Sequence, residues 1–155
     1  MKSMCTGLLT LAVAANTTLA SDRDKVVKIK FIYDGTTVTG SLEDNAASRE
    51  FLTMLPLTVK LEDYGSTEKI AWLPAKLRHA DSRQAITPRA GDIAYYVPWG
   101  NLAIFREDFR HSPGLIKLGR IEQGFESLRK SGSESVTIVR YKEPRLTIKK
   151  HSPPD

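Results

Sequence analysis

Cysteine is almost absent from this sequence, because Cys5 is the only one among 155 residues. No disulfide can form within one chain, so stability must come from an apolar core. The length suits one domain that is large enough to bury such a core. Hydrophobic residues make up 41% and charged residues 26% of the chain, which excludes a collagen-like or a disordered protein.

Histidine is also sparse, and no familiar catalytic motif is present. His79, His111 and His151 are dispersed, and neither they nor Cys5 have the spacing of a metal site. The chain has no G-x-S-x-G turn, no glycine-rich phosphate loop and no H-E-x-x-H pair. Adjacent acidic residues on a strand face opposite sides, so we interpret two such pairs as turn and surface charges: Glu62-Asp63 and Glu107-Asp108. The sequence predicts neither a metal site nor a cofactor.

Basic residues outnumber acidic ones, and the net charge is +5. They are scattered along the chain, and the densest cluster lies near the C-terminus, at Lys142, Arg145, Lys149 and Lys150. A nucleic-acid interface needs a basic stripe with interleaved aromatic residues. The pattern therefore favours a solvated surface, and we predict no nucleic-acid partner.

The N-terminal residues 1–20 differ from the rest. A lysine at position 2 precedes an apolar run at 7–15, and the small residues after it end at Ala20. This is typical of a secretory signal peptide cleaved after Ala20, and a poorly structured cytoplasmic N-terminus is the alternative. The run is shorter than the roughly 20 residues that span a bilayer. A lipoprotein signal would place a cysteine at the end of the run, but Cys5 precedes it, so we predict no lipid anchor. We also predict no integral membrane segment after cleavage. The protein is then expected to be periplasmic or secreted.

Alternating apolar residues predict strands over most of residues 21–150. The strands at 25–33 and 36–42 are joined by Asp34-Gly35, a strong hairpin signal. Others are expected at 57–61, 68–73, 93–97, 102–106, 115–121 and 136–140, with a last short one around 146–148. A helix capped by Asp44 or Asn45 is expected to end at Pro56, and a second one covers 124–130.

This order of elements predicts a mainly β protein. We expect a single domain at 21–150, built as a closed antiparallel barrel of about eight strands with two short helices. Residues 75–90 lack a clear pattern and are predicted to form a long loop, and residues 151–155 a disordered tail.

Aromatic residues gather around the hairpin at 93–106. In a strand, Tyr95 and Tyr96 point to opposite sides, so one of them must face out of the barrel or into a cleft. An aromatic shelf beside a cation could hold a flat ligand. The candidate ligand-binding residues are Trp72, Tyr96, Trp99, Asn101, Phe105 and Arg106. The alternative is that these residues are ordinary barrel core, with a tryptophan packed in the turn.

Four segments carry a family resemblance. They are GDIAYYVPWGNLAIF at 91–105, FLTMLPL at 51–57, the stretch 68–74, and LGRIEQG at 118–124. Together they resemble small bacterial cyclophilin-like proteins, over about residues 25–141. The resemblance implies a cyclophilin-like barrel, in a family that consists mostly of proteins without an established activity.

Larger cyclophilins are prolyl isomerases, and the resemblance lets their pocket be compared with this chain. Residues 69–74 resemble the strand that carries their catalytic arginine, which would fall on Ala71. Counted back from the LGR segment, their pocket histidine would fall on Leu115 and their pocket tryptophan on Arg110. Isomerisation crosses a barrier of about 18–20 kcal/mol, and alanine offers no donor to a twisted amide.

We therefore expect an exported, non-catalytic module that binds a small molecule or a peptide of unknown identity. The alternative is a divergent peptidyl-prolyl cis-trans isomerase that takes its cation from Arg106 or Arg78. A different enzyme that uses the same fold has no support beyond the permissiveness of the fold.

Overall fold

The computed structural model describes residues 26–141. The signal peptide predicted at 1–20, the basic cluster at 142–150, the strand expected around 146–148 and the tail at 151–155 lie outside the described residues. Among the described residues, no helix is both long and apolar enough to cross a membrane.

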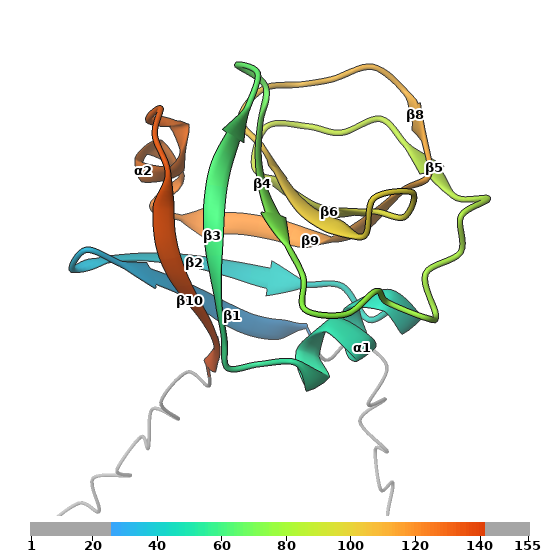
Figure 1. Cartoon of the computed structure of the whole chain (residues 1–155), viewed down its shortest axis with the longest axis horizontal. Coiled ribbons are helices and arrows are strands. Elements are labelled where there is room, and N and C mark those ends of the chain that lie inside the picture. The colour runs from blue at the N-terminus through green and yellow to red at the C-terminus, as the bar shows by residue number, and fades with distance from the viewer. Residues whose placement is uncertain (1–25, 142–155) are drawn as a thin grey trace, which may run out of the picture.

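Eight antiparallel strands form a closed barrel, which confirms the predicted fold class (Figure 1). Around the barrel they follow the order β1-β10-β3-β4-β7-β6-β9-β2, so β1 and β7 lie on opposite walls. The strands are β1 (Val27–Tyr33), β2 (Thr36–Leu42), β3 (Leu57–Tyr64), β4 (Glu68–Trp72), β6 (Asp92–Tyr96), β7 (Asn101–Phe105), β9 (Leu115–Gln123) and β10 (Glu134–Tyr141).

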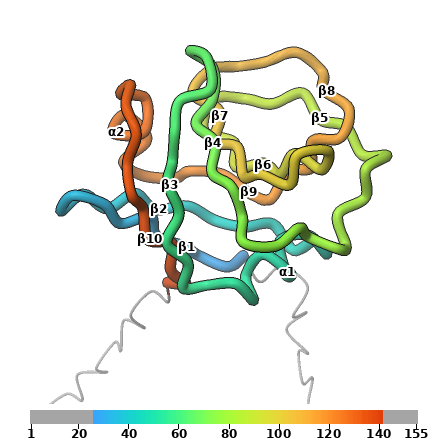
Figure 2. The backbone as a smooth tube through the Cα atoms, in the orientation of Figure 1, coloured from blue at the N-terminus to red at the C-terminus, as the bar shows by residue number. Residues whose placement is uncertain are grey.

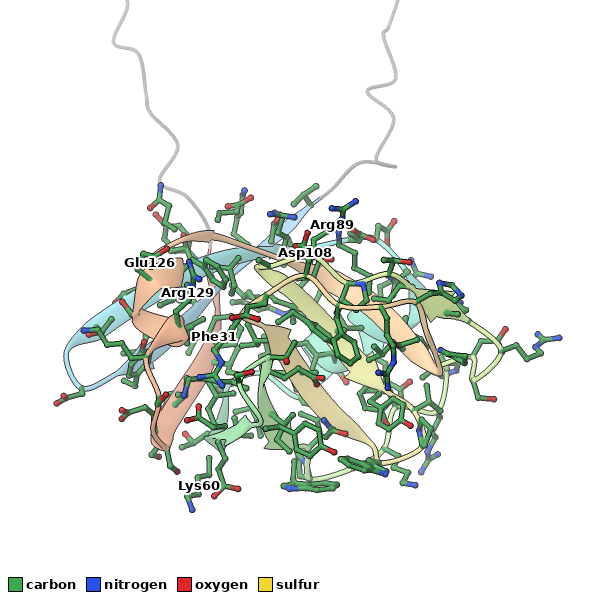
Figure 3. The ribbon with its side chains drawn as sticks, turned by 90° about the horizontal axis from the view of Figure 1, so that it is seen from above. Phe31, Lys60, Arg89, Asp108, Glu126 and Arg129 are labelled. Carbon is green, nitrogen blue, oxygen red and sulfur yellow. The ribbon has the colours of Figure 1, made fainter. Side chains whose placement is uncertain are left out.

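The alternation of the first hairpin shows why these residues become strands. Ile29 and Phe31 are fully buried inside the barrel. Ile32, the next residue, points to the other face of the strand and is 40% exposed. Asp34 and Gly35 both have positive φ, as the predicted tight turn requires. Figure 3 shows Phe31 inside the barrel and the charged side chain of Lys60 on the outside.

The two predicted helices are present and short. Helix α1 (Ala46–Thr53) begins after Asn45, whose side chain accepts a hydrogen bond from the Ser48 amide at 2.9 Å. Its buried residues include Phe51, which joins the barrel core. Helix α2 (Phe125–Arg129) contributes Leu128 to the same core from another side of the barrel (Figure 1).

Strands β2 and β9 approach so closely that glycine is required at their junction. Gly119 lies opposite Leu42, and a Cβ atom on Gly119 would stand 1.9 Å from the carbonyl oxygen of Ser41. Gly40 on the partner strand is similarly crowded, since a Cβ atom there would stand 2.8 Å from the carbonyl oxygen of Arg120. The barrel therefore closes at this seam only because both strands carry glycine there.

A small second layer covers the outside of one wall. The segment 75–90 was predicted as a loop, but it contains the two-residue strand β5 (Ala85–Ile86). This strand pairs with β8 (Ser112–Pro113), and Figure 2 shows the two segments side by side, away from the barrel axis. Beneath this layer lies a second apolar cluster, formed by Ile70, Ala94, Ala103, Phe105 and Leu115 and flanked by Ile86, Tyr96 and Phe109.

Candidate functional site

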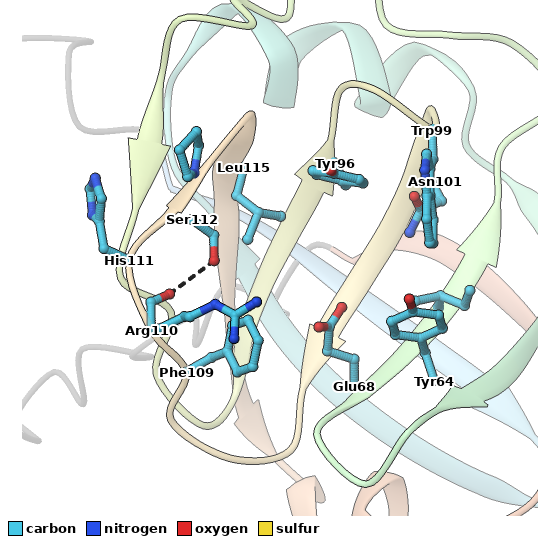
Figure 4. Close-up of a pocket in the computed structure, with 12 residues that line it drawn as sticks. Tyr64, Glu68, Tyr96, Trp99, Asn101, Phe109, Arg110, His111, Ser112 and Leu115 are labelled. Carbon is cyan, nitrogen blue, oxygen red and sulfur yellow. Dashed lines mark hydrogen bonds between the residues drawn. The ribbon is translucent and has the colours of Figure 1, made fainter.

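A pocket opens on the outer face of the barrel, at the margin of this second layer (Figure 4). It has a volume of about 310 Å³. Strands β4, β6, β7 and β9 form its floor, and the segment between β7 and β9 forms one side. The lining residues are Tyr64, Glu68, Ile70, Tyr96, Trp99, Asn101, Phe109, Arg110, His111, Ser112, Pro113 and Leu115.

The β6–β7 hairpin supplies the central residues of the pocket. Tyr95 points into the barrel, where it is 1% exposed and its hydroxyl accepts a hydrogen bond from the Leu77 amide at 3.0 Å. Tyr96 points outward and lines the pocket. The expectation that one of the two tyrosines faces a cleft is confirmed. In the turn, Gly100 has a φ of 75° and its amide donates to the Tyr96 carbonyl at 2.8 Å, which places Trp99 at the rim.

Trp99 is the centre of an exposed aromatic cluster. Its ring lies 5.5 Å from Tyr96 and 5.5 Å from Tyr64, both edge to face, and is stacked 6.3 Å from Trp72. Tyr64, Trp72 and Trp99 are 48%, 55% and 44% exposed, and we call these three residues the aromatic shelf. Trp72 lies outside the pocket, whereas Trp99 belongs to both pocket and shelf. The shelf thus extends the pocket along the surface.

Asn101 is a buried polar residue in the pocket wall. It is 2% exposed, and its Nδ2 donates to the Leu102 carbonyl at 3.2 Å. Its Oδ1 is buried and has no hydrogen-bond partner among the described residues. Because solvent does not reach this oxygen, it lies beneath the pocket surface, and a ligand could reach it only after a neighbouring side chain moves.

Glu68 is the acidic group of the pocket. It is half-buried at the start of β4, opposite Phe105 in the register. Figure 4 shows its carboxyl pointing into the space that Tyr96, Leu115 and Asn101 border. Burial raises the pKa of the Glu68 carboxyl, since the charged form loses water there. No ion pair with another residue of the range 26–141 offsets this loss.

The opposite end of the pocket is basic and aromatic. Phe109 packs on Phe105 with ring centres 6.1 Å apart, and the exposed Arg110 places its guanidinium 5.0 Å from the Phe109 ring. Ser112 donates to the Arg110 carbonyl at 2.9 Å, which fixes the local backbone. This end offers a cation that solvent can reach. Among residues 26–141, no group of three or more His, Cys, Asp or Glu side chains could hold a metal.

Two residues that the sequence proposed for the site lie elsewhere. Arg106 is 5% exposed and does not line the pocket, because its Nη1 binds Asp63 at 3.1 Å and its Nη2 donates to the Gly65 carbonyl at 2.7 Å. Phe105 is fully buried and packs beneath Phe109. Arg106 therefore stabilises the fold beside the pocket and gives the shelf no cation.

The acidic pairs are only partly surface charges. Glu62 pairs with Lys60 on the surface, as expected. Asp63 instead holds two buried cations, because its Oδ1 also accepts from Lys69 Nζ at 2.8 Å and Lys69 is 2% exposed. Asp63 is therefore a surface charge, as expected, but one that also balances two buried cations. Asp108 pairs with Arg89, near the edge of the molecule in Figure 3.

The positions carried over from the larger cyclophilins fall on both sides of the barrel wall. Leu115 and Arg110 do line the pocket, as the resemblance implies. Ala71, the position that corresponds to the catalytic arginine, is fully buried in the barrel core and therefore faces inward. The residues of β4 that face the pocket are Glu68 and Ile70, and neither is a cation.

Comparisons with known proteins agree with the barrel. The model of the cyclophilin-like family matches residues 31–139, most of the chain. The chain belongs to the cyclophilin-like family. The solution structure of a hypothetical protein from Archaeoglobus fulgidus superimposes with a TM-score of 0.57 at 18% identity, covering 78% of this chain and 99% of that one. No curated protein sequence matches.

Sequence reasoning missed several lining residues. Tyr64 is the last residue of β3, which extends beyond the strand predicted at 57–61, so Tyr64 was not among the candidates. Glu68 could have been found by parity, because it lies two residues before Ile70 and four before Trp72 on the same face of β4. Phe109 and Ser112 come from an irregular segment, and only the pairing of β5 with β8 brings them over the barrel wall.

Proposed function

We propose that this cyclophilin-like protein is an exported binding module that takes a small molecule or the side chains of a short peptide into the pocket beside the β6–β7 hairpin. The observation that carries the proposal is the combination, in one pocket, of the exposed rings of Tyr64 and Trp99 with the half-buried carboxyl of Glu68, which has no ion-pair partner among residues 26–141. A concave site with apolar and aromatic walls and a few polar groups is the usual form of a ligand site.

The dimensions and composition of the pocket support this proposal. Its volume of about 310 Å³ lies at the lower end of the 300–1,000 Å³ that is typical of small-molecule sites. Such sites are mostly apolar with a few convergent polar groups, and here Ile70, Leu115 and Tyr96 surround Asn101 and Glu68. The shelf gives a longer ligand, such as a peptide, a surface to follow beyond the pocket.

Binding can be tested with a mixed library of small fragments and short proline-containing peptides, added to the full chain. Trp72 and Trp99 are the only tryptophans, so a ligand in the pocket should quench or shift their fluorescence saturably. Trp99→Ala should abolish the response of any hit. Ile32→Ala, on the opposite wall of the barrel, is the matched control and should bind normally. Unchanged affinity in Trp99→Ala would place binding elsewhere and overturn the proposal.

A second candidate is prolyl isomerisation, which one observation favours. Arg110 lies in the pocket at a position that the resemblance assigns to the pocket of the larger cyclophilins, and a guanidinium there can donate to a twisted amide. The candidate rests on Arg110, because Arg106 is paired with Asp63 and Arg78 does not line the pocket.

This second candidate is tested by NMR exchange between the cis and trans forms of a short Xaa-Pro peptide. An isomerase accelerates an exchange that takes tens to hundreds of seconds without catalyst. The acceleration should disappear in Arg110→Ala and persist in Arg83→Ala, an exposed arginine outside the pocket. No acceleration by the unaltered chain would remove the candidate.

Export forms part of the first proposal, and its support is the pattern of residues 1–20. Expression in a bacterial host followed by N-terminal sequencing of the periplasmic and secreted fractions tests it. A mature chain that begins at Ser21 is the expected result. Uncleaved protein that stays in the cytoplasm would overturn the proposed location without affecting the pocket.

A further inference from the structure

The acidic group of the pocket is the carboxyl of Glu68. The residue is half-buried at the start of β4, and its side chain lines the pocket. No hydrogen bond or ion pair from another residue of the range 26–141 lowers the pKa of this carboxyl, so a ligand with a donor would be its first partner.

The rings beside this carboxyl also favour positive charge. Tyr96 and Tyr64 meet Trp99 edge to face at 76° and 86°, so ring faces of different orientation border one end of the pocket. Aromatic faces attract cations within about 6 Å, and tryptophan does so most strongly. A carboxylate and ring faces together form an environment that is complementary to an ammonium group.

The arginine of the pocket is more exposed than Glu68. Arg110 interacts with the Phe109 ring, at the end away from Trp99 (Figure 4). No ion pair joins it to Glu68 within the described part of the chain. Its long side chain can move into solvent when a ligand enters, whereas Glu68 is half-buried. The Glu68 carboxyl therefore sets the charge that a ligand meets on the floor of the pocket.

We propose that the pocket selects organic cations, namely primary or secondary ammonium groups attached to a flat or aliphatic apolar body. The ammonium donates to the Glu68 carboxylate, and the apolar body packs between Tyr96, Trp99 and Leu115. A lysine side chain or the N-terminus of a peptide carries the same chemistry as a free amine. This inference rests on the proposed binding function and narrows its ligand class.

Three probes of similar size and different charge test it at pH 7: phenethylamine, 2-phenylethanol and 3-phenylpropionate. Each is titrated into the full ¹⁵N-labelled chain, and the indole N–H signal of Trp99 is followed after assignment with Trp99→Phe. Charge-assisted hydrogen bonds are worth about 1.5–3 kcal/mol, so the amine should bind about tenfold or more tightly than the alcohol. The propionate should bind most weakly.

Charge variants then locate the preference. Glu68→Gln keeps the shape of the side chain and should bring the amine and the alcohol to similar affinities. Glu68→Lys should reverse the order and favour the propionate. Glu126→Gln, on the exposed side chain of α2, is the matched control and should leave the tenfold preference unchanged. A preference that survives in Glu68→Gln would overturn the assignment to this carboxylate.

The outcomes separate this inference from the function on which it rests. Equal binding of all three probes at Trp99 would overturn the cation preference and leave a binding pocket. A response to none of them would also overturn the preference, whereas the binding function fails only if the wider library leaves the tryptophan fluorescence unchanged too. A preference for the amine with shifts at Trp99, lost in Glu68→Gln, is the result that supports the proposal.

Discussion

Asp63 is the acceptor that allows two cations to be buried beside the pocket, and its replacement by asparagine is the sharpest test of how this wall is held together. Its Oδ1 binds Lys69 and Arg106, and its Oδ2 accepts from the Gly132 amide at 2.8 Å. Lys69 also donates to the Gly132 carbonyl at 2.8 Å. Asp63→Asn keeps the size of the side chain and removes the charge that balances both cations.

The expected loss of stability follows from burial. Removing one partner of a buried ion pair costs about 3–5 kcal/mol, because the other charge stays buried without compensation. The cations are 2% and 6% exposed, but the Asp63 side chain is 28% exposed, which favours the lower end of the range, about 3 kcal/mol. At about 4 °C per kcal/mol, the melting temperature should fall by roughly 12 °C.

The loss should depend on pH with a defined sign. The hydrogen bond from Lys69, with further help from the Gly132 amide and the charge of Arg106, lowers the pKa of the Asp63 carboxyl in the folded protein. A lowered folded pKa stabilises the protein above the unfolded pKa of about 3.9, and this contribution is lost as the pH falls through the folded pKa. The difference between the unaltered chain and Asp63→Asn should therefore be constant from about pH 5 to 8 and shrink below about pH 4.

Urea unfolding followed by tryptophan fluorescence and circular dichroism measures this difference. Glu62→Gln, the neighbouring acidic residue with a surface partner, is the control and should change stability by less than about 0.5 kcal/mol. A loss below about 1 kcal/mol in Asp63→Asn at pH 7, with an unchanged urea dependence, would refute the view that this carboxylate balances two buried charges.

Three further variants test the fold around the site. Gly119→Ala should prevent folding or cost more than about 4 kcal/mol, because no Cβ fits 1.9 Å from a carbonyl oxygen; a native circular dichroism spectrum with normal stability would contradict the crowded seam. Tyr95→Phe should cost about 1–2 kcal/mol in urea unfolding by leaving the buried Leu77 amide without an acceptor, and an equally stable variant would contradict that bond. The Glu50 carboxylate accepts a hydrogen bond from the His79 amide at 2.8 Å, so Glu50→Gln should speed hydrogen exchange at that amide with little change in global stability. Unchanged exchange would show that the segment 75–90 is held by other contacts.

Much of the fold could be predicted from the sequence because a barrel is built from local signals. Alternation marked the strands, and the Asp34-Gly35 turn and the hairpin at 97–100 fixed which strands are neighbours. Asn45 was one of two predicted caps, and its side chain does bind the Ser48 amide. These features depend on residues that are close in the chain, so a single sequence is enough to find them.

The site could be predicted only in part, since it depends on contacts between distant segments. The hairpin placed Tyr96, Trp99 and Asn101 together, and all three line the pocket. Arg106 follows the same strand, but its side chain pairs with the carboxylate of Asp63, which lies 43 positions earlier in the chain. No local pattern reveals this contact. Phe109 reaches the pocket because β8 pairs with β5 across a long connection.

The hairpin that supplies the site lacks the polar outer face that an antiparallel strand normally presents to water. Its inward residues, such as Tyr95 and Ile104, fill the barrel, while Ala94 and Ala103 on the outer face are also fully buried. Small apolar residues on the outside of a barrel require a cover, and β5 with β8 provides it. The pocket lies where this cover stops, and Asn101 is the first polar residue on that face of β7. The change from alanine to asparagine along one face therefore separates the part of the wall that another layer covers from the part that is left for a ligand.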